Sequence, residues 1–290
     1  MTPPAPPAPF GARLAAAVAD RGPLCVGIDP HRSLLLHWGL DDDVAGLRRF
    51  TDTVVEALAA RVAVLKPQLA FYERHGSAGI AVLEEAVVRA RAAGALVLLD
   101  AKRGDIGSTM DAYGEYLRAD HPLAVDALTV SPFLGPGSLE PAVRTARESG
   151  GGLFVLARTS NPEGGAVQHA VTGGRSVAQT VVDAVGRWNA PGADPAAPGT
   201  APGGWGPDTG SFGVVVGATL PELDVDLTGL GGPVLAPGLG AQGGSVADLR
   251  RLFGRDSAVV PTVSRDVLAA GPDAGALQAA ADRWTAQLGA

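Results

Sequence analysis

Residue types that mark particular protein classes are scarce in this chain. Its 290 residues include one cysteine, Cys25, and five histidines without metal-ligand spacing. This excludes a disulfide framework and a cysteine zinc cluster, and it fits a reducing compartment. No apolar run reaches the roughly 18 residues that a membrane span needs, and the Pro/Ala-rich N-terminus lacks the basic segment of a signal peptide. We therefore expect a cytoplasmic protein with no membrane partner.

Positive charge and aromatic side chains are also in short supply. The chain has 23 basic and 30 acidic residues, a formal net charge of −7, and only 5% aromatic residues. An acidic surface disfavours nucleic acid as a partner, and few aromatic rings are left for a base-stacking platform. The 46% of hydrophobic residues is enough for a large core, which excludes a disordered chain.

Lysine is the scarcer of the two main cations. Lys66 and Lys102 are the only lysines among the 23 basic residues, so arginine serves as the general surface cation. A lysine ammonium is compact and can give up its proton, which an arginine guanidinium does not do. The two retained lysines are therefore candidates for proton-transfer chemistry, although drift in composition would also explain them.

Eight short apolar runs predict the strands of a barrel. Such continuous runs are typical of strands buried on both faces, and four segments between or after them show helical periodicity. The predicted strands are 24–28, 62–65, 96–99, 127–130, 153–156, 214–216, 233–236 and 258–261, and the predicted helices are 44–60, 80–93, 175–188 and 274–288. We predict one α/β domain over residues 1–290, a (β/α)₈ TIM barrel. An open doubly wound sheet is the alternative.

Two segments are expected to lie outside the barrel core. Residues 1–10 read as a flexible N-terminus. Residues 190–210 contain 11 glycines and prolines in 21 positions, which indicates a flexible loop insertion. Since this insertion leads from a predicted helix to the next strand, a barrel places it on the N-terminal face, away from catalysis. Trp205 alone suggests packing there.

Polar residues follow the predicted strands, where barrel enzymes carry their catalytic groups. Both lysines belong to this set. The residues at these ends are Asp29, Lys66, Asp100 with Lys102, Ser131, Ser160, Thr219, Gln242 and Arg265.

The densest of these clusters follows the third strand. Asp100 and Lys102 lie two residues apart and point to the same side of an extended chain, and Asp105 completes a D-x-K-x-x-D pattern. A lysine between two carboxylates keeps its proton, and paired carboxylates repel an anion unless that anion leaves. The pattern suits loss of CO₂ followed by proton delivery, with a salt-bridged loop as the simpler interpretation.

A glycine-rich stretch follows the seventh strand. Residues 236–244 contain G-x-G-x-x-G formally, but they come too late in the chain for a dinucleotide-binding fold and lack its downstream carboxylate. In a barrel, the loops after strands seven and eight form a phosphate site, and Arg265 would supply its charge. Each glycine alone would equally suit a turn.

These motifs, in this order, resemble the orotidine 5′-phosphate decarboxylase family, in its longer bacterial subgroup (type 2). The segments that carry the resemblance are 25–30, 66–68, 100–109, 159–162, 237–244 and 264–266. The resemblance implies conversion of orotidine 5′-monophosphate to UMP and CO₂, the last step of de novo UMP synthesis, without a metal or organic cofactor. It also implies a homodimer with active sites at the shared interface.

The resemblance assigns catalytic roles to four residues. Lys102 is the implied proton donor to C6 of the pyrimidine, and Asp100 lies beside the departing carboxylate. Asp105 completes the charged network from the partner subunit. Lys66 braces Asp100 and binds a ribose hydroxyl.

The resemblance also implies a set of substrate contacts. Asp29 and Thr109 would bind the ribose, Ser160 the pyrimidine amide, and Gln242 with Arg265 the phosphate. The segment 161–174 and the loop of Gln242 would act as lids.

Three other functions fit parts of the pattern. Relatives that act on keto-sugar phosphates use the same loop to hold Mg²⁺, so a metal-dependent decarboxylase or aldolase is the main alternative. A Schiff-base aldolase would need Lys102 at a lowered pKa, whereas carboxylates raise it. A barrel that only binds a phosphorylated ligand would be expected to lack a charged residue, and none is missing.

Overall fold

Eight parallel strands close into a barrel in the computed structural model, which describes residues 8–190, 204–255 and 257–289. The hydrogen-bonded order is β1-β10-β9-β8-β5-β4-β3-β2, and β1 pairs with both β2 and β10. This closure confirms the predicted barrel and rules out the open sheet. The barrel strands are β1 (Cys25–Ile28), β2 (Val64–Pro67), β3 (Leu96–Arg103), β4 (Ala127–Val130), β5 (Gly152–Arg158), β8 (Phe212–Val216), β9 (Val234–Pro237) and β10 (Val259–Val263).

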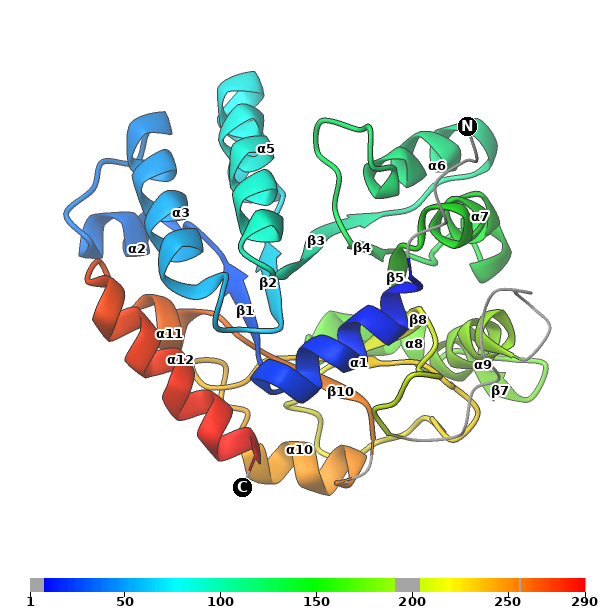
Figure 1. Cartoon of the computed structure of the whole chain (residues 1–290). Helices are drawn as coiled ribbons and strands as arrows, with labels where there is room; N and C mark the ends of the chain where they lie inside the picture. The colour runs from blue at the N-terminus through cyan, green and yellow to red at the C-terminus, as the bar shows by residue number, and fades with distance from the viewer. Residues whose placement is uncertain (1–7, 191–203, 256, 290) are drawn as a thin grey trace.

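Helices surround the barrel and cover the outer faces of the strands (Figure 1). All four predicted helices are present, as α3, α5, α9 and α12. The helices are α1 (Phe10–Arg21), α2 (Arg32–His37), α3 (Val44–Leu58), α4 (Ala70–Glu73), α5 (Gly76–Ala92), α6 (Gly107–Gly114), α7 (Glu140–Ser149), α8 (Gly165–Gln168), α9 (Val177–Asn189), α10 (Val246–Phe253), α11 (Arg265–Leu268) and α12 (Ala274–Gly289). Short 3₁₀ turns η1 (Glu115–Leu117), η2 (Pro136–Leu139) and η3 (Pro162–Gly164) and a hairpin of β6 (Val171–Thr172) and β7 (Arg175–Ser176) complete the chain.

The strands are largely apolar, which suits elements whose two faces are both buried. Inward-facing side chains such as Val64, Leu98, Phe154 and Val215 fill the barrel, while the opposite faces pack against the helices in a second, larger cluster. Cys25 belongs to the inner set, and burial raises the pKa of its thiol to about 12. The single cysteine is therefore a neutral core residue.

Helix α1 closes the N-terminal end of the barrel, across which it lies in Figure 1. Phe10 and Leu14 enter the inner cluster, and the Phe10 ring meets Phe154 edge-on at 6.0 Å between centroids. The fit is close, because a Cβ on Gly152 would lie 2.3 Å from the Phe10 ring. The predicted flexible stretch 1–10 included Phe10, but its ring is 1% exposed. The Pro/Ala-rich composition concealed an amphipathic helix with an i, i+4 apolar spacing.

The predicted loop insertion lies mostly outside the described residues, since 191–203 are not among them. Its last part, 204–210, lies beside α1, where a Cβ on Gly11 would meet the carbonyl oxygen of Thr209 at 1.9 Å. Trp205 packs against the inner cluster, as the sequence suggested. Residues 204–210 are thus at the N-terminal end of the barrel, opposite the strand ends that carry the polar residues.

Replacing Phe10 by Ala should destabilise the chain by about 3–5 kcal/mol, because the loss of a fully buried ring leaves a cavity that the rigid strands cannot close. Urea unfolding of both proteins measures the difference. Leu36→Ala is the matched control: this side chain is 47% exposed, so its loss should cost less than about 0.5 kcal/mol. Equal effects of the two substitutions would contradict the role of α1 as a closing helix.

Candidate active site

A cavity of about 500 Å³ opens at the carboxyl ends of the barrel strands. Residues distant in sequence meet there because parallel strands all end at the same rim. The predicted site residues that line it are Asp29, Lys66, Asp100, Lys102, Gln242 and Arg265.

Strand β3 delivers two of these residues by continuing past its apolar run. Its pairing with β4 shifts register between Leu99 and Arg103, and Lys102 has φ +48°, the one positive φ of a non-glycine residue in the described chain. That conformation costs on the order of 1–3 kcal/mol unless its surroundings impose it. Thr129 of β4 does so: its hydroxyl accepts the Lys102 backbone N–H at 3.0 Å and donates to Asp100 Oδ1 at 2.8 Å.

The Asp100 carboxylate lies between both lysines of the protein. Lys66 Nζ donates to Asp100 Oδ2 at 3.0 Å, and Lys102 Nζ donates to Oδ1 at 2.6 Å. Gln68 Oε1 lies 3.4 Å from Lys102 Nζ and accepts a second hydrogen bond from it. The Lys66 side chain is 6% exposed and that of Lys102 is 45% exposed. Lys66 is therefore a buried support, whereas Lys102 presents its ammonium to the cavity.

Mutual attraction keeps the buried Lys66–Asp100 pair charged. Burial alone would lower the pKa of Lys66, but the carboxylates of Asp100 and Asp29 outweigh it and raise that pKa above its ordinary value. Burial would likewise raise the pKa of the Asp100 carboxyl, and the two ammonium groups outweigh it and hold that pKa well below the usual range. At neutral pH the cavity thus contains a carboxylate fixed between two cations.

One carboxylate oxygen in the same cavity has no hydrogen-bond partner within the described residues. It is Asp29 Oδ1, at the end of β1, and it is buried. Buried polar atoms are normally paired, so this oxygen can accept a hydrogen bond from a ligand.

The opposite side of the cavity is glycine-rich and carries a free cation. Gly238, Gly240 and Gly243, in the loop after β9, have φ values of +112°, +69° and +96°, which only glycine adopts readily. This conformation folds the loop on itself: the Gly240 N–H donates to the Gly244 carbonyl at 2.9 Å and the Gly243 N–H to the Gly240 carbonyl at 2.6 Å. Arg265 at the start of α11 is exposed and forms no ion pair with another described residue. Gln242 lies on the glycine loop beside it.

Three predicted residues are not among those that line the cavity. Ser160 follows Thr159, which does line it, and is packed against Gly217 at the end of β8. Asp105 and Thr109 lie beyond the end of β3, where Asp105 Oδ1 accepts the backbone N–H of Ile106 at 2.8 Å. One chain therefore brings together the lysine array and the glycine loop, but not Asp105 and Thr109.

Sequence reasoning missed several residues of the cavity. Thr129 was hidden inside an apolar strand, although a polar residue among buried ones was a usable signal. In the sequence, Gln68 stands out only as part of the segment 66–68. His31 and Phe71 line the cavity with their rings edge-on at 4.3 Å, and nothing in their sequence context marks them.

Over the described ranges, no group of three or more His, Cys, Asp or Glu side chains is arranged to hold a metal ion. No helix in this part of the chain has the length and hydropathy to cross a membrane.

The fold and the cavity define the class of protein: a (β/α)₈ barrel with a lysine–carboxylate array and a glycine-rich loop at the carboxyl ends of its strands. The model of the family described as "Orotidine 5′-phosphate decarboxylase / HUMPS family" matches residues 22–280. The chain belongs to this family.

Similar proteins extend over the full length of the chain. A Streptomyces coelicolor protein named orotidine 5′-phosphate decarboxylase is 62% identical over 283 residues, with 97% of each chain covered. A Salinispora arenicola protein of the same name is 62% identical over 277 residues, covering 94% of this chain and 95% of the relative. A crystal structure from Streptomyces avermitilis superimposes with a TM-score of 0.90 at 59% identity, covering 99% and 97% of the two chains.

Replacing Asp100 by Asn should destabilise the chain by about 3–5 kcal/mol at neutral pH, because Lys66 would stay buried without its charged partner. The folded state lowers the Asp100 pKa, so the carboxylate stabilises the chain above its ordinary pKa of 3.8. This contribution is lost as the pH falls from 3.8 toward the folded value. Urea unfolding at a series of pH values should therefore show a difference between wild type and variant that shrinks below about pH 4.

The control for this prediction is Asp282→Asn, which removes a carboxylate that is 60% exposed and paired with Arg61. Its effect should stay below about 1 kcal/mol. A difference between wild type and Asp100→Asn that does not change in acid would show that the carboxylate is not what stabilises the array.

Proposed function

We propose that this chain decarboxylates orotidine 5′-monophosphate to UMP and CO₂. The observation that carries the proposal is the Asp100 carboxylate held between Lys66 and Lys102 at the mouth of the barrel. Membership of the family and the name shared by relatives at 60–62% identity support it. The alternative, a metal-dependent enzyme acting on keto-sugar phosphates, is not favoured by these relatives.

The chemistry of the step follows from the placement of charge. The C6–carboxylate bond breaks, CO₂ leaves, and the electron pair stays on C6. A substrate carboxylate placed beside Asp100 is repelled by it, and the repulsion ends when neutral CO₂ departs. The carbanion at C6 has no electron sink in the ring, so it must be stabilised by a fixed ammonium. Lys102 supplies that charge and then donates an Nζ proton to C6.

Lys102 is a better proton donor than Lys66. Lys66 is almost fully buried and its pKa is raised by two carboxylates, so its role is to hold Asp100 in place. Lys102 is nearly half exposed, and its ammonium is positioned by Asp100 and Gln68. A donor that faces the cavity reaches the substrate, while its two acceptors fix its direction.

The rest of the substrate has complementary groups around the cavity. The unpaired Asp29 Oδ1 suits a ribose hydroxyl. Arg265, Gln242 and the glycine loop suit the phosphate, which lies away from the reacting carbon. Binding energy from this remote phosphate can be used to close the loops around the ring. Ser160 is assigned to the pyrimidine amide from the family resemblance.

We also propose that the functional unit is a homodimer. The loops after β3 and β4 touch, since Ser131 N–H donates to the Arg103 carbonyl at 2.7 Å. Farther along these loops lie two exposed apolar side chains: Ile106 is 63% exposed and Phe133 is 78% exposed. An apolar surface next to a cavity favours a partner there. A second copy on this face would place its Asp105 and Thr109 near the site that they do not reach within one chain.

A cytoplasmic location stays a prediction from the sequence.

The activity is tested by adding orotidine 5′-monophosphate to the purified protein in excess EDTA and following the ultraviolet absorbance of the substrate. Rapid conversion to UMP is expected, since the proposed chemistry uses only side chains. Lys102→Ala should lose turnover by at least about 10³-fold, because both the ammonium and the proton are removed, yet still bind UMP. If the protein instead left this substrate unchanged and acted on a keto-sugar phosphate only after Mg²⁺ was added, the chain would be assigned to the metal-dependent relatives.

The shared active site is tested by mixing two inactive variants, Lys102→Ala and Asp105→Ala. If Asp105 acts in the partner's site, a mixed dimer has one site with both wild-type residues. An equal mixture that exchanges subunits freely should then regain about a quarter of wild-type activity. Each variant alone, at the same concentration, is the control. No recovery after proven subunit exchange would place Asp105 outside the partner's site.

A further inference from the structure

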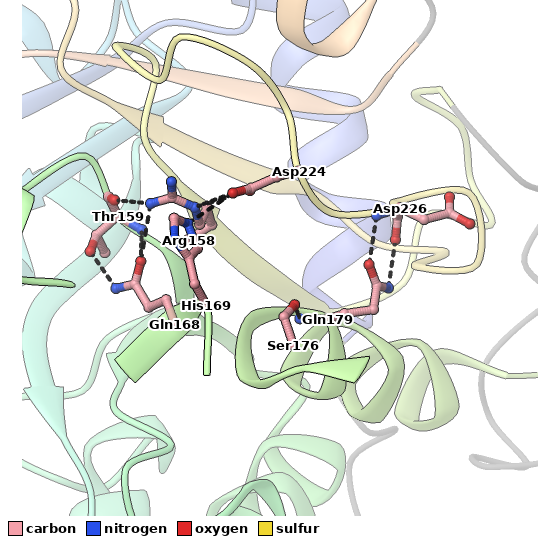
Figure 2. A network of polar contacts seen from close by, with 8 residues as sticks. All are labelled: Arg158, Thr159, Gln168, His169, Ser176, Gln179, Asp224 and Asp226. Carbon is pink, nitrogen blue, oxygen red and sulfur yellow. Dashed lines mark hydrogen bonds and ion pairs between the residues drawn. The ribbon is translucent and has the colours of Figure 1, made fainter. Parts of the chain in front are cut away.

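A polar network links the segment after β5 to a second loop on the cavity rim (Figure 2). We call residues 159–176 the post-β5 segment; it contains η3, α8 and the β6–β7 hairpin. Its first residue, Thr159, lines the cavity, and its second is Ser160. Residues 217–233, between β8 and β9, form the second loop, here called the β8 loop. The position of Ser160 therefore depends on how the post-β5 segment is anchored.

Gln168 folds the post-β5 segment back on its own start. The Gln168 Oε1 accepts the Thr159 backbone N–H at 3.0 Å, and Gln168 Nε2 donates to the Thr159 hydroxyl at 2.6 Å. The Thr159 hydroxyl in turn donates to Asn161 Oδ1 at 2.7 Å. Both residues that flank Ser160 are thus held by side-chain hydrogen bonds.

Arg158 ties this folded segment to the β8 loop. Its side chain is 10% exposed, and Nε donates to both carboxylate oxygens of Asp224 at 3.0 Å. The same guanidinium donates to the Thr159 carbonyl at 2.8 Å and to Gln168 Oε1 at 3.3 Å. His169 Nε2 lies 2.9 Å from Asp224 Oδ2. Asp224 is therefore the one charged group of the β8 loop to which Arg158 and His169 both reach.

The backbone at the end of β8 sets the remaining boundary for Ser160. Gly217 N–H donates to the Arg158 carbonyl at 2.8 Å. A Cβ on Gly217 would lie 2.9 Å from Ser160 Cβ, so Ser160 packs directly against the start of the β8 loop. A shift between the two segments would move Ser160 relative to the cavity.

The far end of the post-β5 segment is anchored separately. Gln179, in the first turns of α9, donates to the Asp226 carbonyl at 3.0 Å and accepts the Asp226 backbone N–H at 2.7 Å. These hydrogen bonds do not involve Arg158 or Asp224 (Figure 2). Loss of Asp224 therefore loosens the end of the segment that carries Ser160 while the other end stays attached.

We propose that Asp224 is a positioning residue for substrate recognition, which acts through Arg158 to place Ser160 against the substrate. This inference rests on the proposed function, because Ser160 is assigned there to the pyrimidine amide. Asp224 itself does not line the cavity, and it belongs to none of the motifs that carry the family resemblance. Its contribution is to hold a buried guanidinium whose other donors fix Thr159 and Gln168.

The test is a double-mutant cycle in the decarboxylase assay with orotidine 5′-monophosphate. Asp224→Ala should lower kcat/KM about 10- to 100-fold, the size expected when a binding group is displaced by about 1 Å. In a Ser160→Ala background the same substitution should lower it less than about threefold, since the residue through which Asp224 acts is gone. Asp224→Asn keeps an acceptor for Arg158 Nε and should recover part of the loss.

Glu222→Ala is the matched control. Glu222 is an exposed carboxylate on the same loop with no polar contact to another described residue, and its removal should leave kcat/KM unchanged. Thermal melting of each variant separates misfolding from mispositioning, and Asp224→Asn completes the cycle if Asp224→Ala does not fold. Equal losses from the Asp224 substitution in both backgrounds, or no loss in either, would overturn the positioning role. A wild-type protein that fails to decarboxylate the substrate would instead overturn the proposed function and this inference with it.

Discussion

One carboxylate held between two ammonium groups organises the mouth of this barrel. Asp100 would be costly to bury alone, and so would Lys66, but each removes the cost of the other. Three neighbouring strands are needed for this: β2 supplies Lys66, β3 supplies Asp100 and Lys102, and β4 supplies Thr129. The positive φ of Lys102 persists because Thr129 accepts a hydrogen bond from its backbone N–H and Asp100 accepts one from its Nζ. The array depends on closure of the barrel, since no single segment could hold these charges in place.

The two ends of the barrel are built for different purposes. The N-terminal end is closed by α1, whose apolar side chains complete the inner core. The opposite end carries polar groups that pair with no other described residue, such as Asp29 Oδ1 and the exposed Arg265 guanidinium. The packing of α1 stabilises the end of the barrel that carries no site residues. The loops at the other end can therefore contain polar groups that find a partner only in a ligand. Residues 204–210 of the glycine- and proline-rich insertion lie at the stable end.

The polar contacts around the cavity extend beyond the residues that face a substrate. Thr129 hydrogen-bonds to the Lys102 backbone and to the Asp100 carboxylate, and Gln68 fixes the direction of the Lys102 ammonium. At the rim, Arg158 and His169 of the post-β5 segment both reach Asp224 of the β8 loop and so connect the two loops. Supporting shells of this kind keep reacting groups within the narrow tolerances that catalysis needs.

The sequence by itself determined the barrel, the strand ends at which polar residues gather and the place of both lysines among them. Local patterns contain that information: apolar runs mark strands buried on both faces, and polar residues that follow them mark the rim. The tertiary structure alone decided which strand ends share a cavity wall, that Thr129 faces the array, and that Phe10 closes the barrel. It also decided that Asp224 reaches Arg158, sixty-six positions earlier in the chain. These are contacts between residues distant in sequence, and they arise only when the strands close and the loops meet, so no local pattern of residue types records them.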